Sequence, residues 1–165
     1  MKNLVMVPIL LGALMLQTVV VSRVQLLYGS ADLMLVVLSA WALQERTRHV
    51  WLWAVGAAGL VAFVSATPLY WWSITYLVIT GAALYLRHRV WQMPVLVLFL
   101  VVFVGSLMEH VPVLVWLRLQ GANLGLLDGL SLVTLPSAIL NLLLVLPVYV
   151  LVRSLANQLY AAEEE

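Results

Sequence analysis

Residues 131–153 read SLVTLPSAILNLLLVLPVYVLVR, an apolar stretch that carries no charge before Arg153. About 20 helical residues, each rising 1.5 Å, match the roughly 30 Å thickness of the hydrocarbon core of a bilayer. Two prolines interrupt the stretch, Pro136 and Pro147, and one amide, Asn141, lies between them. The stretch predicts a membrane-spanning helix that ends at Arg153.

One side of this helix is expected to be small and polar. At 100° per residue, Thr134, Ser137, Ala138 and Asn141 share about one third of the helix circumference. In lipid, small residues let helices approach closely, and an interhelical amide hydrogen bond contributes about 0.6–2 kcal/mol. We interpret the stripe as a packing surface inside the protein, and the alternative is a partner or ligand contact at Asn141.

The composition places the whole chain in a membrane. Of its 165 residues, 65% are hydrophobic and 9% are charged, whereas soluble domains carry about 25% charged residues. The net charge of +1 gives no attraction to nucleic acid. The chain has no cysteine, which excludes disulfides, thiol catalysis and cysteine-bound metal.

The apolar runs predict an all-α membrane protein with six transmembrane helices, forming a single domain over residues 1–165. Residues 111–130 are apolar but contain Pro112, Arg118 and three glycines. We therefore expect a re-entrant or interfacial segment there, and not a seventh span. The six predicted spans cover residues 4–22, 26–43, 50–66, 68–86, 94–110 and 131–153.

The charges outside these spans predict the orientation. With six spans both termini share one side, and the loops of that side hold six of the eight Lys and Arg residues. The positive-inside rule then places both termini in the cytoplasm. The two groups are Lys2, Arg46, Arg48, Arg87, Arg89 and Arg153 on the terminal side, and Arg23 and Arg118 on the other.

Few residues could carry out chemistry. Asp32 and Glu109 lie at the ends of predicted spans, where an ionisable residue is a functional candidate, although Asp32 can equally cap the helix that follows it. Glu109 and His110 are adjacent, so on a helix they point about 100° apart and chelate a metal poorly. No hydrolase, zinc-protease or phosphate-loop motif occurs. We therefore expect neither an enzyme nor a bound cofactor or metal.

Two stretches resemble the bacterial rod shape-determining membrane protein family MreD. One is SADLMLVVL at residues 30–38, where the family typically has proline, aspartate, leucine and an aliphatic run. The other is PSAILNLLLVLPVYVLVR at residues 136–153, with the family's spacing of proline, asparagine, proline, aromatic and arginine. Ala31 stands where the family usually has proline, and residues 59–66 lack an aspartate that the family often carries.

The resemblance implies a non-enzymatic subunit of the cell-elongation machinery in the bacterial inner membrane. Its expected partners are an MreC-like protein and, directly or through it, the RodA glycosyltransferase and a penicillin-binding transpeptidase, which together support peptidoglycan synthesis in the cell wall. The candidates for partner contact or helix packing are Asp32, Glu109, Arg118, Pro136, Ser137, Asn141, Pro147 and Arg153. Glu109 to Leu130 is expected to be the periplasmic contact surface.

A second function stays open. The MreD fold is similar to that of the substrate-binding subunits of energy-coupling-factor vitamin transporters. A vitamin-binding subunit needs an outward cavity lined by convergent polar and aromatic groups. Such a lining could come from Asp32, Tyr70, Trp71, Trp72 and Glu109, whereas an interaction subunit needs no such cavity.

Overall fold

The computed structural model describes residues 6–44, 47, 49–65, 69–89, 93–121 and 125–161. Several residues used above lie outside this part: Lys2, Arg46 and Arg48 of the charge count, and positions 4–5, 66 and 68 at the ends of predicted spans. The described residues form an all-α fold of six helices with one small β-hairpin between the first two.

The first three helices are α1 (Met6–Val19), α2 (Leu33–Ala42) and α3 (Val50–Val64), followed by α4 (Leu69–Arg89) and α5 (Pro94–Leu119). The sixth helix runs without a break from Leu126 to Ala161. It consists of α6 (Leu126–Gly129), a π-helical turn (Leu130–Thr134) and α7 (Leu135–Ala161). A 3₁₀ turn (Val21–Arg23) extends α1, and the strands β1 (Gln25–Leu26) and β2 (Gly29–Ser30) form the hairpin.

Helix α2 is the centre of the molecule. All ten of its residues are buried, and it contacts α1, α3, α4, α5 and α7. Asp32 caps its first turn, since the Asp32 carboxylate accepts a hydrogen bond from the Leu35 amide at 3.0 Å. At its other end Arg87 of α4 donates to the Gln44 carbonyl at 2.7 Å, which places a cation at the negative end of the helix dipole.

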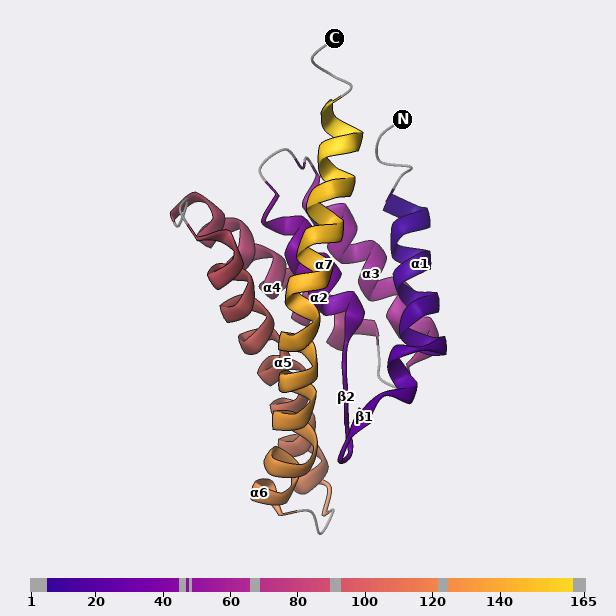
Figure 1. The fold of residues 1–165 in the computed structure, drawn as a ribbon. Helices are drawn as coiled ribbons and strands as arrows, with labels where there is room; N and C mark the ends of the chain where they lie inside the picture. The colour runs from indigo at the N-terminus through magenta and orange to yellow at the C-terminus, as the bar shows by residue number, and fades with distance from the viewer. Residues whose placement is uncertain are drawn as a thin grey trace.

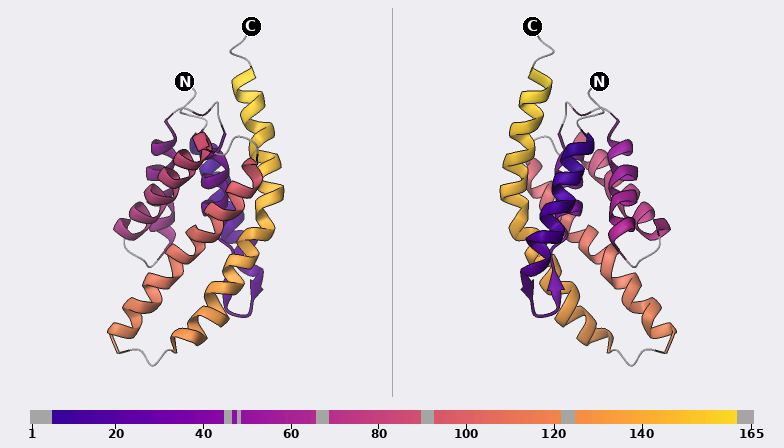
Figure 2. Two further views of the ribbon diagram at one scale, coloured as in Figure 1. Left: turned by 90° about the vertical axis from the view of Figure 1, so that its left-hand side faces the viewer. Right: turned by 90° about the vertical axis from the view of Figure 1, so that its right-hand side faces the viewer.

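Four helices among the described residues are long and apolar enough to cross a membrane: α1 with its 3₁₀ extension, α4, α5 and the continuous α6–α7 helix. Helices α2 and α3 are shorter, with 10 and 15 residues. Helix α1 begins and α7 ends at the same end of the molecule (Figure 1). At that end also lie the end of α2, the start of α3, the end of α4 and the start of α5 (Figure 2).

The predicted span over 26–43 is helical only in its second part. Residues 25–30 form the β-hairpin, and the helix begins only at Leu33. Non-helical backbone at membrane depth must find hydrogen-bond partners inside the protein. Here the partners come from the last helix, because the Tyr28 amide donates to the Leu132 carbonyl at 3.1 Å and the Ser30 amide to the Ser137 hydroxyl at 3.1 Å.

Pro136 explains why the Leu132 carbonyl is available. In an α-helix this carbonyl would accept from the amide four residues later, which is position 136, and proline has no N–H. The preceding π-helical turn widens the helix at the same place. The last helix therefore offers the hairpin an acceptor that a regular helix would use itself.

Residues 111–130 do not form a segment separate from the neighbouring helices in the part that the structure describes. Helix α5 continues through Pro112 to Leu119, and the last helix begins at Leu126, five residues before the predicted span. The two helices form a hairpin whose tip extends beyond α3 and α4 (Figure 2). A single proline removes one backbone hydrogen bond, and a membrane helix tolerates that loss where neighbouring groups compensate.

Candidate functional site

A buried chain of hydrogen bonds links the two motif stretches. The Asp32 amide donates to the Asn141 side-chain oxygen at 2.6 Å, and the Asn141 side-chain nitrogen donates to the Ser106 hydroxyl at 2.8 Å. Ser106 in turn donates to the Val102 carbonyl at 2.9 Å. The asparagine amide thus uses both its acceptor and its donor to join the start of α2, α5 and α7.

The carboxylate of Asp32 is held from two sides. One oxygen accepts from the Leu35 amide at 3.0 Å, and the other accepts from the Tyr76 hydroxyl of α4 at 3.1 Å. The position at the amino end of α2 adds the favourable potential of the helix dipole. Asp32 therefore caps α2, which is one alternative predicted from the sequence, and it also faces a pocket, which the other alternative, a functional residue, requires.

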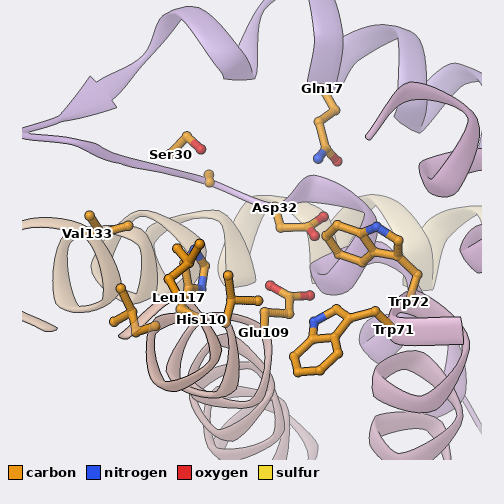
Figure 3. A pocket seen from close by; sticks show the side chains of 12 residues that line it. Gln17, Ser30, Asp32, Trp71, Trp72, Glu109, His110, Leu117 and Val133 are labelled. Atoms are coloured by element: carbon orange, nitrogen blue, oxygen red, sulfur yellow. The ribbon is translucent and has the colours of Figure 1, made fainter. Parts of the chain in front are cut away.

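This pocket has a volume of about 440 Å³. It is enclosed by the hairpin, by α1 at Gln17, by the first turn of α4, by α5 and by the π-helical turn at Val133 (Figure 3). The hairpin, the end of α1 and the start of α4 lie in the half of the molecule away from the start of α1 and the end of α7 (Figure 1). Its lining is Gln17, Ser30, Ala31, Asp32, Trp71, Trp72, Glu109, His110, Val113, Leu114, Leu117 and Val133.

Glu109 is the least compensated group in the pocket. It is 6% exposed, and its Oε1 atom has no hydrogen-bond partner among the described residues. Its carboxyl group points toward that of Asp32, with the two indole rings on the same side of the pocket (Figure 3). Glu109 is therefore an interior residue of α5, and the prediction that it lies on a periplasmic contact surface is wrong.

His110 is the one imidazole in the pocket lining. Its Nδ1 atom lies 2.9 Å from the Ser106 carbonyl, and a carbonyl only accepts, so Nδ1 carries the hydrogen. This contact directs the imidazole along its own helix. Among the described residues, no group of three or more His, Cys, Asp or Glu side chains could hold a metal ion.

The remaining sequence candidates separate into two groups. Pro136, Ser137 and Asn141 are buried and hold the hairpin and α2, whereas Arg118, Pro147 and Arg153 are exposed. Of the five residues suggested as a ligand lining, the structure brings four together, Asp32, Trp71, Trp72 and Glu109, and leaves Tyr70 outside the pocket. The chain matches no protein-family model, no curated protein and no solved structure.

The sequence did not single out Gln17 and Gly29 as parts of a site. The Gln17 side chain accepts from the Met34 amide at 3.0 Å and thereby joins α1 to the start of α2. A Cβ atom at Gly29 would lie 2.6 Å from the Ser137 amide nitrogen. As a lone polar residue inside an apolar span, the glutamine predicts an interhelical hydrogen bond, which the structure confirms, whereas the glycine resembles an ordinary turn residue.

Proposed function

We propose that this protein is a multi-pass membrane subunit of the MreD type, which acts by holding a partner membrane protein with one span and an outer region. It crosses the membrane six times, with both termini in the cytoplasm. Its expected partner is an MreC-like protein, through which it supports the peptidoglycan-synthesising glycosyltransferase and transpeptidase. The resemblance of residues 30–38 and 136–153 to MreD supplies the partner's identity.

The proposal rests on the length of the α5–α6 hairpin and on the exposed apolar side chains at its tip. At 1.5 Å per residue the continuous helix from Leu126 to Ala161 is about 54 Å long, well above the roughly 30 Å of a hydrocarbon core. Trp116, Leu119 and Leu127 near the tip are 60%, 78% and 80% exposed. We place this tip outside the lipid, where large exposed apolar side chains are typical of a protein contact.

The proposal of six crossings is supported by the hairpin that precedes the short helix α2. Helix α2 would cover only about 15 Å by itself. The hairpin precedes it, and the backbone of that hairpin is hydrogen-bonded to the last helix. Hairpin and α2 together make a crossing in which backbone groups of the non-helical part find hydrogen-bond partners on the last helix.

Co-expression with the MreC-like protein of the same organism tests the proposal. The parent chain should co-purify with that protein in detergent, and the double variant Trp116→Ala, Leu127→Ala should recover at least about tenfold less of it, since a tenfold loss needs only about 1.4 kcal/mol. The matched control is Leu143→Ala, Leu146→Ala, whose exposed side chains lie in the middle of α7. Equal recovery from both double variants, or a parent without the partner, contradicts the proposal.

The pocket favours a second candidate, a small-molecule-binding subunit of a transporter. It is supported by the convergence of two carboxyl groups and two indoles on one cavity. A chain of this kind would purify with an ATPase module, and the MreC-like protein would be absent. Analysis of the proteins that co-purify with a tagged chain from native membranes distinguishes the two functions.

A further inference from the structure

We propose that the pocket between the hairpin, α4 and α5 binds an ammonium group, carried by a small amino alcohol or by the headgroup of a lipid. This inference names the ligand class for the second candidate function and does not depend on the partner at the hairpin tip. It stands on the cavity, the two carboxyl groups in it, and the aromatic rings beside them.

The two carboxyl groups differ in the hydrogen-bond donors and favourable helix dipole that the protein places around them. Asp32 has an amide donor, a tyrosine hydroxyl donor and the amino end of a helix. Glu109 lies inside α5, far from either end of that helix, and one of its oxygens has no donor among the described residues. A buried carboxylate without a partner is costly, so Glu109 is the group that a ligand would complete.

The protein's own cations do not supply that partner. Neither carboxyl group forms an ion pair with a Lys or Arg among the described residues, and no such residue lines the pocket. His110 is the one lining residue that can be cationic, and its Nδ1 hydrogen is engaged by the Ser106 carbonyl. No Lys or Arg side chain among the described residues therefore balances the two carboxyl groups, which leaves a proton on Glu109 or a cation from outside to do so.

The aromatic lining selects an organic cation. Trp71 and Trp72 border the cavity next to the carboxyl groups (Figure 3), and a cation over an indole face gains about 0.5–2 kcal/mol. A metal ion would need more ligands than the described residues offer. The buried Nε1 atom of Trp72 also lacks a partner, and as a donor it suits a ligand that has an oxygen near its ammonium group.

The test uses the purified full-length chain in detergent, in a buffer free of amines. Ethanolamine is the soluble probe, and its binding is followed by titration calorimetry. For the lipid source, the chain is placed in nanodiscs of mixed phosphatidylethanolamine and phosphatidylglycerol, and the retained lipid is identified by native mass spectrometry. Saturable ethanolamine binding supports a soluble ligand, and selective retention of phosphatidylethanolamine supports a lipid headgroup.

Glu109→Gln is the central variant, because the unpartnered oxygen gives this side chain no hydrogen bond to lose on the Oε1 side. It should weaken binding of either probe at least tenfold. Trp71→Leu, which keeps both carboxyl groups, should weaken it several-fold. Asp128→Asn makes the same change of charge at an exposed position outside the pocket and should bind as the parent does.

Two results overturn the inference. One is a folded parent that neither binds ethanolamine nor retains phosphatidylethanolamine over phosphatidylglycerol, as expected if Glu109 simply carries a proton. The other is binding that Glu109→Gln leaves unchanged. If the chain binds an ammonium probe but captures no ATPase module, the proposed ammonium site stands and only the proposed transporter function is contradicted.

Discussion

Asn141 shows how one amide can hold three elements of a membrane protein together. Its oxygen accepts from the Asp32 amide and its nitrogen donates to Ser106, so the start of α2 and the middle of α5 both depend on this side chain of α7. The residue is completely buried. In this position its hydrogen bonds are satisfied inside the protein.

Replacing Asn141 with leucine should destabilise the folded protein by about 0.5–2 kcal/mol, because an interhelical hydrogen bond is lost and a buried backbone amide is left without an acceptor. Asn141→Gln, which keeps the amide, should cost less. The measurement is unfolding by sodium dodecyl sulfate in mixed micelles. Asn157→Leu is the matched control, since Asn157 is an exposed amide on the same helix. If Asn141→Leu unfolds with the parent, the network does not stabilise the fold.

At the scale of single residues, the sequence predicted the candidate site residues but not that they lie close together in the fold. Asp32 and Glu109 stood out because charges are rare inside apolar spans. Their approach depends on the crossing of α2 and α5, which hydropathy does not encode. Trp71 and Trp72 illustrate the same gap, because the sequence suggested them as possible lining residues but could not show that they lie beside the two carboxyl groups, as they do in the pocket.

At the scale of elements, the β-hairpin against the last helix is the least regular part of the fold. Gly29 lies where the two backbones come closest. A Cβ atom there would be 2.6 Å from the Ser137 amide nitrogen and 2.8 Å from Pro136 Cβ. Because the first of these neighbours is backbone, the contact cannot be relieved by turning a side chain.

Gly29→Ala should therefore push the hairpin away from α7 and destabilise the protein by about 1–3 kcal/mol, the usual cost of overpacking. The same detergent unfolding assay measures it. Gly12→Ala provides the comparison, since a Cβ atom at Gly12 in α1 has no neighbour within 4 Å and alanine favours a helix by about 1 kcal/mol over glycine. A Gly29 variant as stable as the Gly12 variant would contradict the close approach.

The helices and the hairpin also show which parts of the fold the sequence alone could predict. The long apolar runs predicted α4, the first part of α5 and the core of α7, because helix length and hydropathy are local properties. The sequence did not predict the hairpin over 25–30 or the continuation of α5 through Pro112, because both depend on contacts with another helix. The hairpin takes hydrogen bonds from α7, and the helix across Pro112 packs its Leu114 against Gly129 of α6.

At the scale of the whole molecule, the arrangement of the helix ends bears on the orientation in the membrane. One end of the molecule holds the start of α1, the end of α7, the end of α4 and the start of α5 (Figure 1). Arg87 and Arg89 close α4 at this end, whereas Arg118 is near the opposite tip. This distribution agrees with the predicted excess of positive charge on the side of the termini.

The orientation predicts the outcome of reporter fusions. A protein that fluoresces only in the cytoplasm should give signal when fused after Glu165, and an enzyme that is active only outside the cytoplasm should be active when inserted after Gly121, at the hairpin tip. The same outside reporter inserted after Arg89, between α4 and α5, should be silent, and it controls for insertion as such. Because six crossings put the tip and the α4–α5 connection on opposite sides, activity after Arg89 together with silence after Gly121 would invert the orientation. Activity at both sites would instead show that the connection and the tip share one side, which removes α5 as a crossing and with it the six-span topology.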